Sequence, residues 1–402
     1  MIKMFSQGHI LPLFIMLISF PYCFSSFQKI PLSNYLHHQT PPHDTPRGYP
    51  TFFRSINDDQ DDSFEPNLES LFKFETHETF ELPRLAQVSS PTSSPDTVNV
   101  DDFGAKGDGR DDTKAFKNAW NAACSSELGA VIVVPKNKNY LLKPITFSGP
   151  CKSAITMKIY GTIIASGNAS DYEKDRLHWL VFNNIQNIKV EGGGTINGNG
   201  KIWWKNSCKV DKTRPCQHAP TAVTFYGCKN LRVDNLKIKN AQQMHLTFQN
   251  CVNVRASNLM VTAPGDSPNT DGIHVTGTQN IQIIKCVIRT GDDCISIVSG
   301  SKNVQALDIT CGPGHGISIG SLGSNNSTAY VSDVMVNRAK LSGTTNGVRI
   351  KTWQGGSGYA KNIRFQNIMM HNVSNPIIIN QNYCDQDDPC PEQFVKSYKV
   401  GL

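Results

Sequence analysis

One short pattern recurs along the chain from about residue 185 to residue 365, an asparagine directly before a strand of alternating apolar and polar residues. The asparagines in these segments are Asn187, Asn230, Asn253, Asn280, Asn303 and Asn362. The four from Asn230 to Asn303 are separated by 23, 27 and 23 residues. A period in the twenties with several short strands is typical of a right-handed parallel β-helix, whereas propellers repeat at about 40 residues or more. Leucine-rich repeats share the period but need leucines that these segments lack.

The repeated asparagines are predicted to be structural. Asparagine tolerates the left-handed backbone conformation of a tight turn, and amide side chains stacked at strand spacing can hydrogen-bond to one another. We therefore expect all six of these asparagines to lie in turns between strands and to take no part in catalysis.

A single helical pattern precedes the repeats. Its apolar positions fall on one helical face: Ala115, Phe116, Ala119, Trp120 and Ala123. Asp111 or Asp112 supplies the N-cap, and the pattern ends near Cys124. We expect an all-β fold, a right-handed parallel β-helix whose N-terminal end is capped by this short helix.

Composition divides the chain into three parts. Residues 1–25 contain one charge, Lys3, and an apolar run followed by small residues, which predicts a secretory signal peptide. The run is shorter than the roughly 20 apolar residues of a membrane anchor. Residues 26–95 are rich in proline, histidine, serine and aspartate, which predicts a disordered linker or acidic pro-segment. Residues 96–402 form the predicted β-helix domain.

Charge is unevenly distributed among these parts. The whole chain has a net charge of +6. Lys3 contributes +1, and residues 26–95 contribute −5 from ten acidic and five basic residues, so residues 96–402 must carry +10. This balance suggests a polyanionic partner, acidic polysaccharide or nucleic acid, although solubility alone would also explain it. Secretion and the lack of interleaved aromatic and basic residues argue against nucleic acid, and no membrane contact is expected once the signal is removed.

The cysteines predict disulfides in a secreted protein. Removal of Cys23 with the signal leaves eleven of the chain's twelve cysteines. The spacing suggests four pairs: Cys124 with Cys151, Cys208 with Cys216, Cys294 with Cys311, and Cys384 with Cys390. The remaining Cys228, Cys251 and Cys286 lie near strands and are interpreted as buried thiols. Glycosylation sequons begin at Asn168, Asn325, Asn326 and Asn372.

Four polar signatures lie between residues 269 and 351. They are Asn269–Gly272, Gly291–Cys294, Gly314–Gly316 and Arg349–Lys351. Asp271 and Asp293 are 22 residues apart, and Asp292 and His315 are 23 residues apart, which matches the repeat. Because stacked strands lie about 4.8 Å apart, we expect these three carboxylates and the imidazole to converge on one wall.

Arg349 and Lys351 should share a face of their strand, with Val348 and Ile350 pointing inward. Strict alternation would separate Asp292 from Asp293, so a bend after Gly291 is needed to expose both. Clustered carboxylates beside cations suit glycoside hydrolysis, in which one carboxylic acid protonates the leaving oxygen and another carboxylate activates water. Where several carboxylates lie close together, their mutual repulsion raises the proton affinity of one of them, so that one can remain an acid. No histidine pair at ligand spacing accompanies the site, so we expect no zinc.

With these four motifs, residues 98–383 resemble the plant polygalacturonases, pectin-hydrolysing glycosidases of family 28 with a right-handed parallel β-helix. The resemblance implies that Asp292 is the general acid and that Asp271 and Asp293 activate the water. It implies that His315 tunes the acid. The implied substrate contacts are Arg349 and Lys351 to galacturonate carboxylates, Tyr383 to the sugar, and Asn269 as a support of the site.

The resemblance further implies inverting hydrolysis of α-1,4 bonds in demethylated pectin, without a metal or other cofactor, by a monomer secreted to the cell wall. Two alternatives remain. A pectate lyase on the same fold would need calcium. A pectin-binding protein without activity would result if the β-helix were incomplete, since the chain stops at Leu402 where family members usually continue, which would leave the last coil uncovered.

Overall fold

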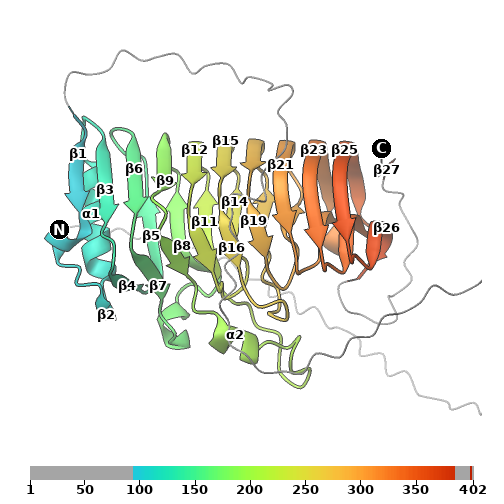
Figure 1. The fold of residues 1–402 in the computed structure, drawn as a ribbon, viewed down its shortest axis with the longest axis horizontal. Helices are drawn as coiled ribbons and strands as arrows, with labels where there is room; N and C mark the ends of the chain where they lie inside the picture. The colour runs from blue at the N-terminus through green and yellow to red at the C-terminus, as the bar shows by residue number, and fades with distance from the viewer. Residues whose placement is uncertain (1–93, 385–398, 401–402) are drawn as a thin grey trace, which may run out of the picture. The chain divides into compact units, whose positions relative to one another are not determined.

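The computed structural model describes residues 94–384 and 399–400, and in these the chain forms a parallel β-helix (Figure 1). The predicted signal peptide and nearly all of the acidic segment lie outside the described residues. The strands belong to two sheets, called here sheet A with 18 strands and sheet B with nine. Every strand pair is parallel, with neighbours contributed by successive coils. The all-β prediction is confirmed.

Sheet B carries one strand from each coil after the first, which contains α1 instead. Its members are β5 (Ile145–Ser148), β8 (His178–Asn183), β11 (Thr221–Tyr226), β14 (Leu246–Gln249), β17 (Ile273–Thr276), β20 (Ile295–Ile297), β22 (Ile317–Leu322), β24 (Asn346–Trp353) and β26 (Asn375–Tyr383).

Sheet A consists of two ladders that merge towards the C-terminal end. One contains β1 (Asp96–Asn99), β3 (Ala130–Val134), β6 (Ile155–Ile159), β9 (Ile188–Glu191), β12 (Lys229–Asp234), β15 (Val252–Ser257) and β18 (Gln279–Ile284). The other contains β2 (Asp108–Asp111), β4 (Asn139–Leu142), β7 (Thr162–Ala165), β10 (Thr195–Asn197), β13 (Lys237–Lys239), β16 (Met260–Thr262) and β19 (Val287–Arg289). Both pair with the long strand β21 (Lys302–Cys311), which is followed by β23 (Thr328–Ser342), β25 (Ser357–His371) and β27 (Lys399–Val400).

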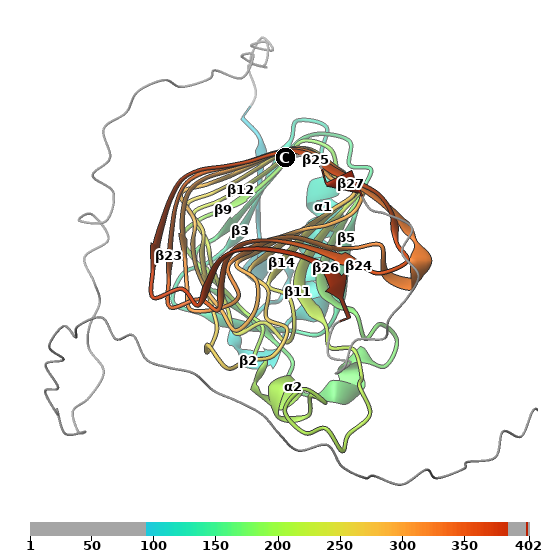
Figure 2. The same ribbon diagram turned by 90° about the vertical axis from the view of Figure 1, so that its right-hand side faces the viewer.

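Helix α1 (Thr113–Cys124) closes the N-terminal end of the coils, as predicted from the sequence. All five predicted apolar residues are buried. Asp111 accepts a hydrogen bond from the backbone N–H of Thr113 at 3.0 Å, and Asp112 is the residue before the helix. The view along the coils from their C-terminal end shows α1 at the far end of the enclosed space (Figure 2). The remaining helices are short: α2 (Lys201–Lys205), η2 (Val100–Phe103), η3 (Ala169–Tyr172) and η4 (Ser324–Asn326).

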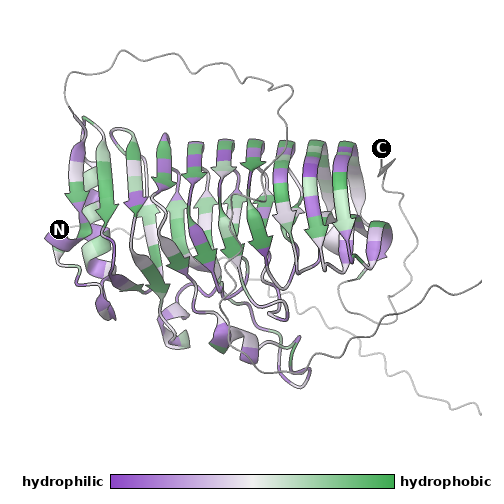
Figure 3. Ribbon diagram, viewed as in Figure 1, coloured by the Kyte–Doolittle hydropathy of each residue, from purple (hydrophilic) through white to green (hydrophobic). Residues whose placement is uncertain are grey.

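The interior is filled by side chains that stack from coil to coil. Four phenylalanines from β5, β8, β11 and β14 form a column with ring centroids 4.8 to 5.6 Å apart: Phe147, Phe182, Phe225 and Phe248. In β17, β20, β22 and β24 the same register continues with aliphatic residues. The alternation of hydrophobic and hydrophilic residues along the strands follows this inward and outward pattern (Figure 3).

The asparagine ladder forms, but the prediction that all six residues lie in turns between strands is wrong for five of them. Only Asn187 precedes its strand, and the other five lie within β12, β15, β18, β21 and β25, where the chain bends without leaving the ladder of strands. All six predicted residues have φ between +53° and +59°. Side-chain amides link Asn187 to Asn230, Asn230 to Asn253, Asn253 to Asn280, and Asn280 to Asn303, with N to O distances of 2.9 to 3.1 Å. In the next coil Asp333, within β23, takes the equivalent position with φ of +58° and accepts a hydrogen bond from Asn362. The ladder therefore fixes one edge of every coil that carries the polar signatures.

Replacing Asn253 by alanine should lower the free energy of unfolding by about 2 kcal/mol. Alanine loses two ladder hydrogen bonds and is strained at φ of +59°, each effect costing about 1 kcal/mol. Asn253→Gly keeps the backbone conformation without strain and should cost about half as much. Urea unfolding of the two variants beside the parent chain measures this difference, and equal effects of glycine and alanine would contradict it.

Three of the four predicted disulfides are present, Cys124–Cys151, Cys208–Cys216 and Cys294–Cys311. Cys384 is also disulfide-bonded, and its predicted partner Cys390 lies outside the described residues. Cys228, Cys251 and Cys286 are free and buried, as interpreted from the sequence. The four sequon asparagines are exposed. Within the described part of the chain, no helix is long and apolar enough to cross a membrane.

The last described coil leaves apolar side chains exposed. Ile377 and Ile379 of β26 are 74% and 46% exposed, and Met369 of β25 is 54% exposed. Strands β17, β20, β22 and β24, which carry or follow the polar signatures, each pair with a neighbour on both sides. The exposed apolar residues therefore lie outside the part of sheet B that positions these signatures.

Candidate active site

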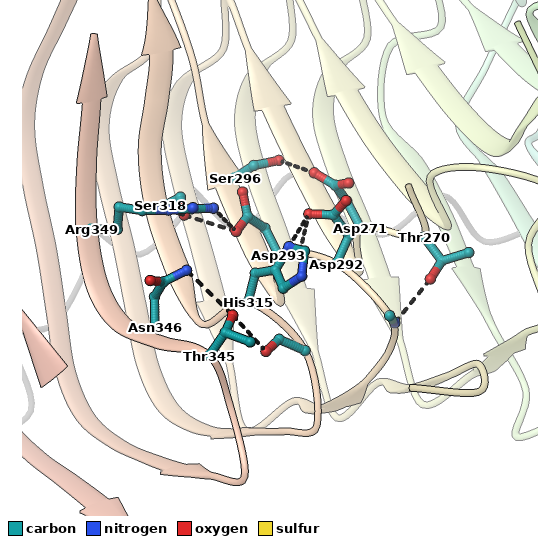
Figure 4. A network of polar contacts seen from close by, with 12 residues as sticks. Thr270, Asp271, Asp292, Asp293, Ser296, His315, Ser318, Thr345, Asn346 and Arg349 are labelled. Atoms are coloured by element: carbon teal, nitrogen blue, oxygen red, sulfur yellow. Dashed lines mark hydrogen bonds and ion pairs between the residues drawn. The ribbon is translucent and has the colours of Figure 1, made fainter. Parts of the chain in front are cut away.

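The four polar signatures meet at the start of the sheet B strands (Figure 4). Ile273, Ile295, Ile317 and Val348 are register partners in β17, β20, β22 and β24. Asp271, Asp293 and His315 each lie two residues before the first three of these, so they form one row across neighbouring coils. The row faces a cavity of about 510 Å³. All eight residues singled out in the sequence line this cavity: Asn269, Asp271, Asp292, Asp293, His315, Arg349, Lys351 and Tyr383.

The bend expected after Gly291 is present. Residues 291 and 292 form a bend before β20, and the backbone N–H of Gly291 donates to the hydroxyl of Thr270 at 2.9 Å. A Cβ at Gly291 would lie 2.0 Å from the carbonyl oxygen of Ser267, so only glycine fits this close approach of two coils. The bend lets both Asp292 and Asp293 point into the cavity.

Asp293 is the buried anion of the site. Its side chain is 1% exposed and accepts hydrogen bonds from Arg349 at 2.7 Å, Lys351 at 3.0 Å and Ser318 at 2.8 Å. The Arg349 Nε also donates to Ser318 at 3.0 Å. Two cations and a hydroxyl thus hold one carboxylate in a fixed orientation. Val348 and Ile350 are buried, so the predicted face of β24 is the one that carries both cations.

Asp292 pairs with His315, whose Nδ1 lies 2.9 Å from Oδ1 of Asp292. The hydrogen bond to Asp292 raises the pKa of His315. Burial raises the pKa of Asp292, but the hydrogen bond from His315 and the charges of His315, Lys351 and Lys209 outweigh burial, so the net shift is downward. Both shifts favour the proton on the imidazole, whose side chain is 40% exposed.

Asp271 has the opposite electrostatic environment. Burial and the nearby charge of Asp292 raise the pKa of Asp271. Its Oδ2 accepts a hydrogen bond from the Ser296 hydroxyl at 2.9 Å, and that hydroxyl lies 2.7 Å from Nδ1 of His274. The three aspartates thus differ in their partners: Asp293 has two cations, Asp292 an imidazole at 2.9 Å, and Asp271 a hydroxyl at 2.9 Å with the imidazole of His274 further away at 4.0 Å.

Several residues that line the cavity were not identified from the sequence. They are Lys209, His274, Ser296, Val298, Gly320, Ser321, Asn380, Asn382 and Cys384. His274 and Ser296 are register partners in β17 and β20 and face the same way as Asp271 and Asp293. Both stand between two buried apolar residues, His274 between Ile273 and Val275 and Ser296 between Ile295 and Ile297, so strand alternation at these positions would have found both.

The chain resembles enzymes of known class. A sequence profile of glycosyl hydrolases family 28 matches residues 124–400. The chain belongs to this family. The Arabidopsis thaliana polygalacturonase QRT2 is 67% identical over 305 residues, which cover 76% of this chain and 69% of that protein. A polygalacturonase of Persea americana is 59% identical over 351 residues, 86% of this chain and 73% of that protein.

A solved family 28 relative has the same architecture. The polygalacturonase of Erwinia carotovora superposes with a TM-score of 0.62 at 25% identity, covering 78% of this chain and 84% of that chain. The right-handed parallel β-helix predicted from the repeats is therefore confirmed, and the chain is a glycoside hydrolase. Glycoside hydrolases use paired carboxyl groups as acid and base, so clustered carboxylates are expected in a member of family 28.

The donor atoms of Asp292, Asp293 and His315 lie within 4.8 Å of one another, close enough to share a metal ion. Both oxygens of Asp293, however, already accept hydrogen bonds from cationic side chains. A divalent ion at this carboxylate would have to displace or repel Arg349 and Lys351. The arrangement in this family 28 chain therefore fits an anionic substrate better than a metal.

His245 supports Asp271 from inside the coils. It is fully buried, and its Nδ1 lies 3.0 Å from the backbone carbonyl oxygen of Asp271. Its Nε2 lies 3.2 Å from the carbonyl oxygen of Thr262 and 3.4 Å from the backbone N of Ala241. Burial lowers the pKa of His245 to about 4. The neutral imidazole thereby fixes the backbone of one aspartate of the family 28 site.

The fold should lose stability in acid through His245. The unfolded imidazole has a pKa of about 6.5, so between pH 6.5 and 4 the unfolded chain binds a proton that the folded chain does not. This contribution is complete above about pH 6.5, and about 3 kcal/mol of it is lost on going from pH 7 to pH 4. Comparing urea unfolding of the parent and His245→Gln at both pH values isolates it, since the carboxylates and the other histidines contribute equally to both chains. If the free energies of unfolding of the parent and the variant differ by the same amount at both pH values, this assignment is contradicted.

Proposed function

We propose that this chain is a polygalacturonase that hydrolyses α-1,4 bonds between galacturonates of demethylated pectin with inversion at the anomeric carbon. The observation that carries the proposal is the convergence of three aspartates in different electrostatic environments on one cavity that also presents Arg349, Lys351 and Lys209. A set of carboxyl groups alone would be compatible with hydrolysis of any glycoside. The added cations favour a substrate that carries carboxylates, and the names of the two plant relatives agree with this.

In the proposed mechanism Asp292 protonates the leaving oxygen, and Asp271 with Asp293 orients and activates the water. His315 lies at hydrogen-bond distance from Asp292 and is partly open to solvent, so it can return a proton to Asp292 after each turnover. A bound galacturonate chain brings negative charge to the cavity, which raises the proton affinity of Asp292 above its ligand-free value. Arg349 and Lys351 hold Asp293 in place during these steps.

Substrate binding is assigned to the residues around this centre. Arg349 and Lys351 line the cavity while holding Asp293, so their charge acts on a uronate carboxylate even where one of their hydrogen bonds stays with Asp293. The Tyr383 ring lies 5.2 Å from Nζ of Lys351 and against Trp353, which presents an aromatic wall to a sugar. Asn269, with φ of +57°, shapes the turn before Asp271.

The proposal places the enzyme outside the cell, acting as a monomer on wall pectin. It rests on the apolar N-terminal run, the sequons and the disulfides in the β-helix. Expression in a plant secretory system followed by N-terminal sequencing and light scattering measures processing and mass. Retention inside the cell, or a stable dimer, would overturn this part alone.

The activity is tested on polygalacturonate with and without a chelator. We expect new reducing ends, an inverted anomer in the first product by proton NMR, and equal rates with and without EDTA. A calcium-dependent lyase would instead stop with EDTA and give unsaturated products that absorb in the ultraviolet. A pectin-binding protein without activity would bind the polymer and release no reducing ends. Either of these outcomes would overturn the proposal.

A further inference from the structure

A second cavity, of about 600 Å³, lies next to the cavity of the three aspartates. It forms where β10, β13 and β16 end, and its outer side is made by α2 and the segment after it. The two cavities share two stretches of chain. Pro268 lines the second cavity and Asn269 the first, and in the same way Val210 lines the second and Lys209 the first. Because consecutive residues are 3.8 Å apart, the two cavities adjoin along both stretches.

The lining of the second cavity combines an aromatic ring, cations and amides. Trp204, Lys201 and Lys205 come from α2, and Asn197, Asn199 and Asn240 come from the ends of the strands or the turns that follow them. The apolar C–H face of a pyranose packs on an indole, amide groups hydrogen-bond to sugar hydroxyls, and ammonium groups bind a carboxylate. This combination suits an acidic sugar.

Trp204 is held in place before any ligand binds. Its indole N–H donates to the backbone carbonyl of Ala241 at 3.0 Å. A Cβ at Gly200 would lie 2.8 Å from the Trp204 ring, so the ring packs directly on a glycine backbone. An aromatic side chain fixed in this way loses little conformational entropy when a sugar stacks on it.

Lys201 and Lys205 are exposed, and no residue in the described ranges forms an ion pair with either ammonium group. The cavity also contains one exposed carboxylate, Asp266, so the lining carries a net charge of +1. Two cations without partners can therefore bind an anion from solution without breaking an existing contact.

The segment between α2 and β11 that joins the cavities is braced. The Cys208–Cys216 disulfide closes it, and Arg176 donates to the carbonyl of His218 at 3.0 Å and to the side chain of Gln217 at 2.6 Å. Arg176 also lies over the Trp203 ring at 5.5 Å. These contacts hold the backbone at Lys209, which lines the first cavity, and at Val210, which lines the second, in fixed positions.

We propose that the second cavity is a binding subsite for a further uronate of the same polysaccharide chain, with Trp204 as the stacking surface and Lys201 and Lys205 as the carboxylate ligands. The inference rests on the proposed polygalacturonase function and adds to it a preference for chains long enough to fill both cavities. Such a chain extends from the cavity of the three aspartates towards α2.

The test compares Lys201→Gln/Lys205→Gln with a charge-matched control, Lys229→Gln/Lys302→Gln, whose exposed lysines line neither cavity. We expect the ratio of kcat/KM for dodecagalacturonate over trigalacturonate to fall about tenfold in the first variant, mostly through KM, and to stay unchanged in the control. The difference should shrink at 0.5 M salt because the contact is electrostatic. Trp204→Ala should also lower the ratio, and Trp204→Phe should retain most of it.

Binding is measured separately, by calorimetry with the same two oligogalacturonates in an Asp292→Asn background. Tighter binding of the long oligomer that is lost with Lys201→Gln/Lys205→Gln supports the subsite, whatever the turnover. An unchanged ratio and unchanged binding in this variant would overturn the subsite while leaving the polygalacturonase proposal intact. Absence of reducing ends from every oligomer with the parent chain would instead refute the polygalacturonase proposal, and the calorimetry then decides the subsite alone.

Discussion

Replacing Asp292 by asparagine should lower kcat on polygalacturonate by about 10³-fold, because an amide cannot give up the proton that the leaving oxygen needs. Asparagine has the same shape and can still face His315 and accept the N–H of Asp293, which now lies 2.8 Å from Oδ1 of Asp292. The fold should therefore be retained. Reducing-end assays beside thermal unfolding measure both effects, and the exposed Asp102→Asn serves as the matched control.

The identity of the acid is decided by the leaving group. An aryl galacturonide with an acidic phenol needs no protonation, so Asp292→Asn should lose far less activity on it than on the polymer. Asp271→Asn, which impairs the water instead, should lose the same factor on both substrates. This comparison is informative because the pKa of Asp271 is raised and that of Asp292 is lowered in the ligand-free site. If the two variants exchange their behaviour, Asp271 is the acid.

Much of the fold follows from the sequence because each coil repeats the same local requirement. A turn with positive φ favours asparagine, and a strand after it must alternate. The coil at Asp333 was not recognised because aspartate meets the same requirement, with φ of +58° and an oxygen that accepts from Asn362. Lys285, at a bend, and Arg338, within β23, also adopt positive φ, and their residue types do not predict it.

The row of site residues was predictable for a similar reason, since coil register converts a spacing of 22 or 23 residues into adjacency. What register could not give is the pairing of side chains. Arg349 and Lys351 both hold Asp293, and this choice among three neighbouring aspartates depends on rotamers and on the bend at Gly291. The second cavity was also hidden, because α2 and the segment after it interrupt the repeat.

The Asp293 cluster predicts the largest loss of stability for a change in the site. Asp293 is 1% exposed, and the side chains of Arg349 and Lys351 are 14% and 10% exposed, so water solvates all three poorly. Lys351→Met removes one cation while filling most of its space, and Asp293 keeps Arg349. Removing one partner of a buried ion pair costs about 3 to 5 kcal/mol. Since one cation remains, we expect a loss of about 3 kcal/mol.

Urea unfolding of Lys351→Met beside the exposed control Lys340→Met measures this loss, and the control should change stability by less than about 0.5 kcal/mol. The double variant Asp293→Asn/Lys351→Met separates charge from packing. Without the carboxylate, removal of the ammonium no longer leaves a buried anion short of a partner. The double variant should therefore lose less free energy of unfolding than the sum of the losses in Asp293→Asn and Lys351→Met. Strict additivity would mean that Lys351 stabilises the fold through its aliphatic chain, and that Arg349 alone compensates Asp293.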